Sequence, residues 1–300
     1  MSQRRRHKGD KIDGWIVVDK EPGMSSAKVV AAVRAITSAA KAGHGGTLDP
    51  IATGVLPIAM GEATKTVAFA LDADKSYRFT VRWGEARDTD DVEGQVIATS
   101  PARPDRAAIE ALLPAFTGRF EQRPPSFSAL KIDGERAYAL ARAGAPPELQ
   151  PRAVTVHRFE LKEAHTDTAV FEVDCAKGTY VRALARDLGE RLGCFGHVEA
   201  LRRTRVGRFG EAQAISLERL RAVWHRGQPC EHLYPVETVL DDIPALAVTG
   251  PQAERLAGGQ AIRVLDTDDG LFRAMARGRL VALAEVQGGD VRPVRVFNLR

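Results

Sequence analysis

The sequence predicts an α+β fold in which a mixed, largely antiparallel sheet is flanked by helices. Apolar and polar side chains alternate over residues 75–83, which is the period of a half-buried strand. Residues 181–192 have the pattern of a helix, and residues 177–180 join it to the strand before it. Beyond Asp242, glycines recur between short apolar runs, which predicts a small β-barrel-like domain at the C-terminus.

The first elements follow from short apolar runs and their punctuation. Residues 14–19 predict a buried strand, and a Pro-Gly pair then predicts a turn. Ser25 or Ser26 is predicted to cap a helix that reaches about Ile36, because a serine oxygen can accept from the first backbone N–H groups. Residues 61–66 are expected to lead into a second helix that runs to about Leu71.

A strand follows this second helix. On the strand at 75–83, Tyr77, Phe79, Val81 and Trp83 share one face. The segment after it is acidic and rich in turn residues. We therefore expect residues 95–98 to return as the hairpin partner of this strand.

The second half of the chain predicts further helices and strands. Residues 106–116 have the pattern of an amphipathic helix, and residues 217–224 that of a short one. A basic helix is expected over residues 134–143. The remaining elements expected from apolar patterning are strands at 154–161, 168–175, 280–286 and 294–299.

Composition shifts and proline positions predict the domain organisation. Prolines at both ends of residues 123–152 indicate an inserted, mobile element on the main domain. The predicted divisions are a basic disordered tail at 1–12, a main domain at 13–241 and a C-terminal domain at 242–300.

The composition is that of an ordinary soluble globular protein, with 44% hydrophobic and 27% charged residues. No apolar stretch approaches the length of a membrane span, and no apolar segment follows the basic start, so we expect neither a membrane protein nor a secretory signal. Three scattered cysteines fit a reducing cytoplasm, and the histidines form no cluster with metal-ligand spacing. We therefore expect a cytoplasmic protein without a metal.

The net charge of +4 is concentrated in the first eleven residues, where five basic side chains accompany one acidic side chain. Within the body, basic residues gather at Arg202, Arg203, Arg205 and Arg208, and more loosely near the C-terminus. Such arginines suit contacts with nucleic-acid phosphates, but a solvated face with internal ion pairs explains each cluster about equally well.

The most informative stretch is the glycine-rich run that begins at Gly43, contains His44 and ends in Asp49 and Pro50. Glycines allow close approach to the backbone, and the proline keeps Asp49 out of the helical region. A rigid loop that presents one carboxylate suits a nucleophile or a general base, although Gly-rich turns are also common loop punctuation. The spacing fits neither a phosphate-binding P-loop nor a dinucleotide fingerprint.

Several motifs in one order give the chain a family resemblance. They lie at 19–26, 43–54, 61–65, 75–77, 177–182 and 201–203. With these motifs the chain resembles the TruB family of bacterial tRNA pseudouridine synthases, which isomerise the T-loop uridine at tRNA position 55. The resemblance extends from about Gly14 to Leu299 and implies the pseudouridine synthase fold, an isomerase activity and the T arm of tRNA as partner. It implies no cofactor and a monomer.

The resemblance also implies roles for individual residues. Asp49 would be the catalytic nucleophile, and Arg182 would pair with it. Tyr77 would stack on the target base and help to move a proton. The remaining implied roles are filling the gap left by the flipped nucleotide for His44, packing near the base for Leu201, a place near the site for Lys20, and RNA-backbone contacts for Arg202, Arg203 and Arg205.

The resemblance further implies that residues 123–152 are a thumb-like insertion that clamps the T arm. The C-terminal domain would be a PUA-type RNA-binding domain. Because arginine stays charged and has a planar fork, we expect a bidentate Arg182–Asp49 pair that lysine would replace poorly.

Two other functions fit parts of the pattern. A non-catalytic RNA-binding or tRNA-folding protein would use the same surface but leave the Asp49 loop unexplained. A hydrolase with an aspartate nucleophile usually pairs two carboxylates, and the sequence shows no clear second acid.

Overall fold

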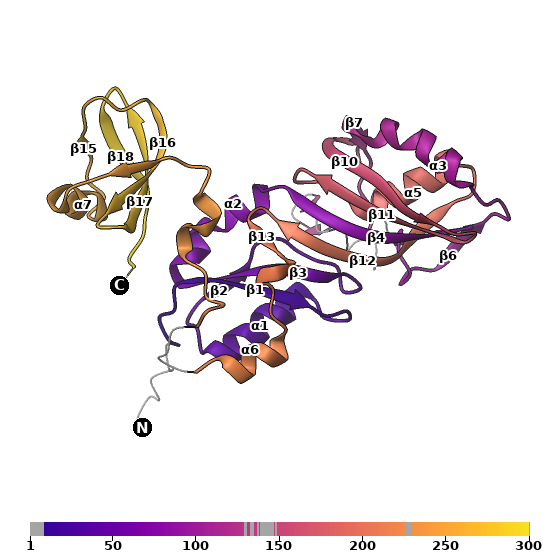
Figure 1. The fold of residues 1–300 in the computed structure, drawn as a ribbon, viewed down its shortest axis with the longest axis horizontal. Helices are drawn as coiled ribbons and strands as arrows, with labels where there is room; N and C mark the ends of the chain where they lie inside the picture. The colour runs from indigo at the N-terminus through magenta and orange to yellow at the C-terminus, as the bar shows by residue number, and fades with distance from the viewer. Residues whose placement is uncertain are drawn as a thin grey trace.

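The computed structural model describes residues 9–128, 131–132, 135–136, 138, 147, 149–225 and 230–299. Within these residues, a nine-stranded sheet forms the centre of the larger part of the molecule (Figure 1). Its main path runs β1, β3, β12, β4, β11, β10 and β7, while β2 pairs with β3 and β13 with β12. The strands are β1 (Gly14–Lys20), β2 (Ala42–His44), β3 (Thr53–Met60), β4 (Lys75–Trp83), β7 (Gly118–Gln122), β10 (Arg152–Ala164), β11 (Thr168–Cys175), β12 (Gly196–Val206) and β13 (Phe209–Gly210).

All pairings in this sheet are antiparallel except that of β12 with β3, which is parallel. The predicted mixed, largely antiparallel sheet is therefore confirmed. The parallel pair joins β3, the strand that follows the Asp49 loop, to the arginine-rich strand β12. It therefore places Arg202 and Arg203 beside the end of that loop.

Helices cover the two ends of the sheet separately (Figure 1). At one end α1 and α6 pack near β1 and β3, and at the other α5 packs on β12 and β4, and α3 on β10. Ser25 caps α1 by accepting from the backbone N–H of Lys28. The helical segments are α1 (Ser26–Thr37), η1 (Gly61–Thr66), α2 (Val67–Asp72), α3 (Arg106–Leu112), η2 (Leu113–Phe116), α5 (Val181–Arg191), η3 (Glu211–Gln213), α6 (Leu217–Val223) and η4 (Val236–Leu240).

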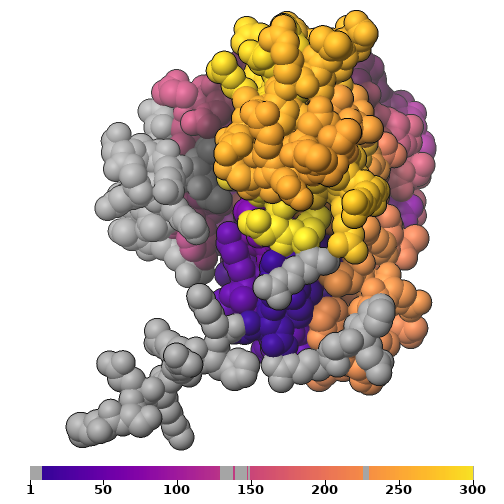
Figure 2. All heavy atoms as spheres, turned by 90° about the vertical axis from the view of Figure 1, so that its left-hand side faces the viewer, coloured from indigo at the N-terminus to yellow at the C-terminus, as the bar shows by residue number. Residues whose placement is uncertain are grey.

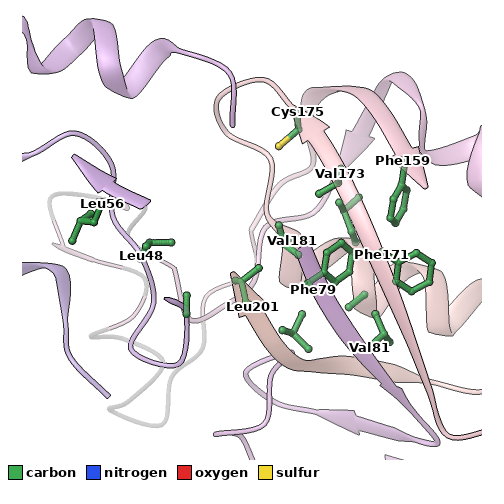
Figure 3. Close-up of a cluster of buried hydrophobic side chains, with 14 of the residues drawn as sticks. Leu48, Leu56, Phe79, Val81, Phe159, Phe171, Val173, Cys175, Val181 and Leu201 are labelled. Carbon is green, nitrogen blue, oxygen red and sulfur yellow. The ribbon is translucent and has the colours of Figure 1, made fainter. Parts of the chain in front are cut away.

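The hydrophobic core lies between the sheet and its helices. Phe79 stacks on Phe171 at 5.4 Å and on Phe159 at 6.0 Å between ring centroids. Leu48 and Leu201 belong to the same buried cluster (Figure 3). Leu48, which directly precedes Asp49 in the glycine-rich loop, is therefore anchored in the core.

Two local predictions were wrong. The segment at 95–98 does not pair with β4, because β11 and β12 occupy both edges of that strand. Instead β6 (Val96–Thr99) pairs with β5 (Glu85–Arg87) as a separate two-stranded sheet. The basic helix does not begin at residue 134, since β9 (Glu135–Arg136) pairs with β8 (Lys131–Ile132), and most of that prediction lies outside the described residues.

The C-terminal part forms its own five-stranded sheet with one helix. The sheet order is β14, β16, β17, β18, β15. Its elements are β14 (Ala245–Ala247), α7 (Gly250–Ala257), β15 (Ile262–Arg263), β16 (Gly270–Ala276), β17 (Arg279–Gln287) and β18 (Asp290–Val296). The strand expected at 280–286 lies inside β17, the last strand begins four residues earlier than expected, and α7 was not predicted.

This C-terminal sheet is seated on the N-terminal strands. Leu280, Leu283 and Phe297 share a buried cluster with Trp15 of β1. The Lys65 ammonium donates to the carbonyl of Val296 at 2.8 Å. Figure 2 shows the yellow and orange C-terminal residues over the indigo N-terminal ones. Among the helices in the described part of the chain, none is long and apolar enough to cross a membrane.

Candidate active site

Asp49 lies in the loop between β2 and β3, and glycines shape both sides of it. Gly46 has φ 132° and Gly54 has φ 94°, a region that side chains strongly disfavour. A Cβ at Gly54 would stand 2.2 Å from the carbonyl oxygen of Arg203. Glycine is therefore required where β3 leaves the loop and meets β12.

Three buried side chains hold this loop. The Ser26 hydroxyl accepts from the backbone N–H of Leu48 at 2.8 Å and donates to its carbonyl at 3.0 Å. The Lys20 ammonium donates to the carbonyls of Pro50 at 2.9 Å and Ala52 at 2.5 Å. The loop is thus pinned directly before and after Asp49, and the Arg203 guanidinium adds bonds to the carbonyls of Gly46 and Thr47.

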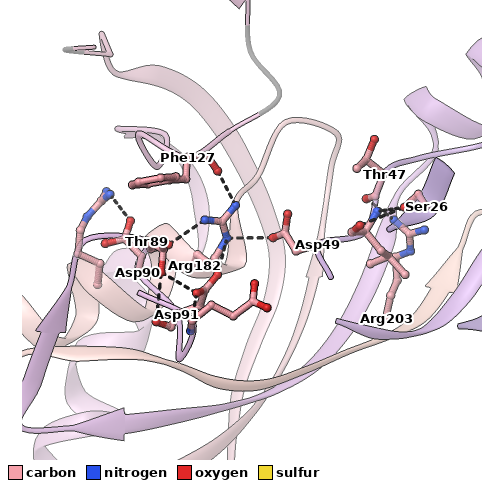
Figure 4. A network of polar contacts seen from close by, with 12 residues as sticks. Ser26, Thr47, Asp49, Thr89, Asp90, Asp91, Phe127, Arg182 and Arg203 are labelled. Carbon is pink, nitrogen blue, oxygen red and sulfur yellow. Dashed lines mark hydrogen bonds and ion pairs between the residues drawn. The ribbon is translucent and has the colours of Figure 1, made fainter. Parts of the chain in front are cut away.

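The central contact of the site joins Arg182, the second residue of α5, to Asp49 (Figure 4). Nε of Arg182 donates to Oδ2 of Asp49 at 2.9 Å. The expected bidentate pair was wrong, because Nη1 donates to the carbonyl of Thr89 at 2.8 Å and Nη2 to that of Phe127 at 2.9 Å. The Arg182 side chain is 6% exposed and that of Asp49 36%. A buried guanidinium therefore aims a carboxylate that solvent can reach.

A second carboxylate, which sequence reasoning missed, lies beside the first. Oδ2 of Asp91 stands 3.6 Å from Nε of Arg182. Oδ1 accepts from the Thr89 hydroxyl at 2.6 Å and from the backbone N–H of Glu93 at 3.1 Å. The Asp91 side chain is 6% exposed, so it is built into the loop that supports Arg182.

Asp49 stands between two cavities. One, of about 310 Å³, is lined by Tyr77 of β4 and Leu201 of β12 together with Asp49 and Arg182. Burial raises the pKa of Tyr77, against the opposing effect of the Arg203 guanidinium, so its hydroxyl stays protonated at neutral pH. The other cavity, of about 390 Å³, is acidic and is lined by Asp88, Asp91 and Glu93 as well as Asp49.

The comparisons with known proteins identify the family. Residues 34–181 match the TruB family pseudouridylate synthase N-terminal domain, and residues 182–241 and 243–298 match the two corresponding C-terminal domains, of tRNA pseudouridylate synthase B and tRNA pseudouridine synthase II. A tRNA pseudouridine synthase B of Rhodopseudomonas palustris is 56% identical over 98% of this chain and 83% of its own length. One of Bradyrhizobium diazoefficiens is 56% identical over 99% and 89%. The chain belongs to the TruB family of pseudouridylate synthases.

Solved structures agree with this TruB membership. A chain of an H/ACA ribonucleoprotein bound to a substrate RNA containing 2′-deoxyuridine has a TM-score of 0.73 and 26% identity, with 96% of this chain and 86% of that chain covered. A chain of a Cbf5-Nop10-Gar1 complex has a TM-score of 0.73 and 27% identity, with 94% and 84% covered. The predicted pseudouridine synthase fold is confirmed.

The arginines on β12 of this TruB protein do not share one environment. Arg203 is 1% exposed and donates to backbone carbonyls of the Asp49 loop and of Val55. It therefore holds the loop, and the expected contact with RNA phosphates was wrong for this residue. Arg202 instead forms a bidentate pair with Asp19 at 3.0 and 3.1 Å, and Nε of Arg205 donates to Ser76 at 3.0 Å.

His44 lies on β2 and does not line either of the two cavities at Asp49. Burial, together with the Arg203 guanidinium, lowers its pKa, so the ring is neutral at neutral pH. Its buried Nδ1 has no hydrogen-bond partner within the described part of the chain. A neutral ring of this kind remains suited to stacking on a base.

The buried ammonium of Lys20 predicts a pH dependence of the TruB site. Burial lowers its pKa to about 8, although Asp49 and Glu93 oppose the shift. Its ammonium has three donors for three carbonyls, those of Glu21, Pro50 and Ala52. As the pH rises through about 8, one donor is lost, and we expect the turnover rate to fall because the Asp49 loop loosens.

The pH prediction is checked by single-turnover rates measured across the neutral and alkaline range, with the melting temperature measured in parallel. Since the pKa of Lys20 is lower in the folded than in the unfolded state, deprotonation of Lys20 raises the free energy of unfolding above pH 8 rather than lowering it. Burial also lowers the pKa of Lys75 to about 8, so Lys75→Gln is the control and should keep the same midpoint. A flat profile, or a fall that disappears in Lys75→Gln, would contradict the assignment to Lys20.

Proposed function

We propose that this protein converts the uridine at position 55, in the T loop of tRNA, to pseudouridine, with Asp49 as the nucleophile. That it is a tRNA pseudouridine synthase, an isomerase, follows from its family and its curated relatives. The observation that carries the proposed role of Asp49 is its contact with Arg182 at the wall of a cavity that also holds Tyr77 and Leu201.

The reaction breaks the bond from ribose C1′ to N1 of uracil and forms a bond from C1′ to C5. The C5 proton is released and N1 gains a proton, so the product is an isomer of the substrate. A carboxylate can assist by attacking C6 of the base, by attacking C1′, or by removing the C2′ proton. In each route the oxygen must be aimed at one atom, and the bond from Nε of Arg182 holds it in one direction.

The target base must leave its stack to reach this carboxylate. Unstacking costs a few kcal/mol, which contacts in the cavity offset. The cavity of about 310 Å³ is at the lower end of the range for ligand pockets, and we propose that Tyr77 stacks on the base while Leu201 packs beside it. We propose that His44 occupies the gap left in the T loop.

Tyr77→Phe tests the role of the hydroxyl. Because the ring remains, we expect tRNA binding and folding to be unchanged, while kcat falls by about 10²-fold if the hydroxyl takes part in proton transfer. The measurement is kcat and KM on an unmodified tRNA transcript, with Tyr234→Phe as the matched control, since Tyr234 does not line either cavity at Asp49. A wild-type kcat would rule out an essential hydroxyl.

We propose that the chain divides near Asp242 into a synthase domain and a PUA-type RNA-binding domain, since a separate sheet begins at Ala245. Arg202 and Arg205 remain candidates for RNA-backbone contacts, because both are only partly buried. The T arm would lie across the synthase domain, with residues 123–152 as the clamp. We further propose that the protein acts as a monomer in the cytoplasm.

The test is to map pseudouridine in an unmodified tRNA transcript after incubation with the wild-type protein, by carbodiimide-dependent stops of reverse transcription. We expect one stop, at the T-loop uridine. A stop at another uridine would keep the activity and refute the position. Tight tRNA binding without any stop would favour the RNA-folding function instead.

A further inference from the structure

Two arginines lie one turn apart on the same face of α5. Arg182 makes the contacts of the active site described above. Arg186 forms a second, largely buried set: Nη1 is 2.9 Å from Oδ2 of Asp90, and Nη2 donates to the carbonyl of Arg123 at 2.7 Å. The Arg186 side chain is 14% exposed and that of Asp90 11%. Its Nε also donates to Asp187, at 2.8 Å.

Both arginines join the same two segments. Arg182 bonds the carbonyls of Thr89 and Phe127. Arg186 bonds the carboxylate of Asp90, the next residue after Thr89, and the carbonyl of Arg123, four residues before Phe127. The loop at 88–91 and the segment at 123–127 are therefore each fixed to α5 at two points. Figure 4 shows Thr89 and Phe127 converging on Arg182.

Asp90 has an unusual backbone conformation, which the contacts around it hold in place. Its φ is 60°, which is uncommon for a residue other than glycine. Its backbone N–H donates to Arg87, and its carbonyl accepts from Val198 of β12. The carboxylate is thereby directed at Arg186. The same backbone conformation sets the direction of the neighbouring Thr89 carbonyl and Asp91 carboxylate.

We propose that Arg186 is a positioning residue for the isomerisation, acting through Asp90 and the Arg123 carbonyl on Arg182 and thus on Asp49. Without it, the acceptors for Nη1 and Nη2 of Arg182 shift, and the guanidinium turns to follow them. Nε, which aims Asp49, turns with it. This inference rests on the proposed role of Asp49, and it adds a group that touches neither the substrate nor the nucleophile.

The test compares Arg186→Gln, Asp90→Asn and the double variant, with Arg191→Gln as the matched control on the same helix. Arg191 is exposed and lies over the ring of Phe116, away from the site. The substrate is a tRNA transcript tritiated at C5 of every uridine, since tritium release reports isomerisation at any position. A displacement of reacting groups by about 1 Å costs up to roughly 10²-fold, so we expect kcat of Arg186→Gln to fall by about 10- to 100-fold with KM little changed.

The double variant should be no slower than Arg186→Gln alone, because both substitutions break one pair. Arg186→Lys should restore part of the rate, since its ammonium can still pair with Asp90. Three results would each overturn the inference. The losses in kcat could multiply in the double variant, the effect could be confined to KM, or the melting temperature could fall while kcat stays normal. If the wild type releases tritium from a uridine outside the T loop, the proposed position fails while this test still holds.

Discussion

Replacing Asp49 by asparagine is expected to abolish pseudouridine formation and to leave tRNA binding unchanged. The amide has nearly the same shape, so the loop held by Lys20, Ser26 and Arg203 should keep its conformation. An amide is a poor nucleophile and a poor base, and loss of a catalytic group of this kind lowers kcat by at least about 10⁴-fold. The measurement is tritium release under single-turnover conditions, beside filter binding of the same transcript.

The matched control for this variant is Asp72→Asn, a carboxylate on α2 that is 61% exposed and pairs with Lys177 outside the site. We expect wild-type rates from it. If Asp49→Asn retained a rate within tenfold of the wild type (about 1.4 kcal/mol of barrier), Asp49 would not be the nucleophile. Loss of both binding and turnover would point to a folding defect instead.

Arg182→Lys is expected to give the second-largest loss. Lysine keeps the charge but gathers its donors on one atom, whereas Arg182 reaches Asp49, Thr89 and Phe127 with three separate nitrogens. Loss of one preorganised donor in an active site typically costs about 10²- to 10³-fold in kcat. Each buried carbonyl left without a donor also costs about 1–3 kcal/mol of stability.

The two effects are separated by measuring kcat on the folded fraction and the free energy of unfolding by denaturant. Arg158→Lys is the control, because Arg158 forms ion pairs with Glu160 and Asp174 on the exposed face of β10 and β11. We expect it to change neither quantity appreciably. An Arg182→Lys protein of wild-type kcat would show that a point charge suffices and would contradict the proposed aiming of Asp49.

The strands and helices with strong periodicity could be predicted from the sequence, because their patterns reflect burial on one face. The strand at 75–83 and the helix at 181–192 match β4 and α5 within a residue. The partner of 95–98 could not be predicted, since pairing depends on which strands occupy the edges of β4. α7 was missed because glycines on both sides of it suggested turns between strands.

The residues of the site were more predictable than their contacts. The motifs indicated Asp49, Tyr77, Arg182 and Leu201, and the structure places all four at one cavity. The bidentate geometry was wrong because the acceptors that divert Arg182 are main-chain carbonyls, which leave no trace in side-chain patterns. Asp91 was missed for a similar reason. It lies between β5 and β6, which form a separate two-stranded sheet, and side-chain patterns do not show that this segment reaches Arg182.

The different fates of Arg202 and Arg203 have a simple physical cause. Both lie on β12, where successive side chains point to opposite faces of the sheet. One of two adjacent arginines must therefore point inward, and Arg203 does so, against the backbone of the Asp49 loop. Arginines that are adjacent on a strand therefore do not form one basic surface. The alternation of side chains along the strand could by itself have predicted that Arg202 and Arg203 lie on opposite faces.

The protein is proposed to isomerise one uridine, in the T loop, with Asp49 as the nucleophile. The most direct test is the stoichiometry of tritium release from a transcript tritiated at C5 of every uridine, beside the same transcript with cytidine in place of the T-loop uridine. The proposal predicts one equivalent of tritium per tRNA from the first transcript and none from the second, and none from either with Asp49→Asn. Equal release from both transcripts would contradict the T-loop assignment, and release by the Asp49→Asn protein would contradict the role of the carboxylate.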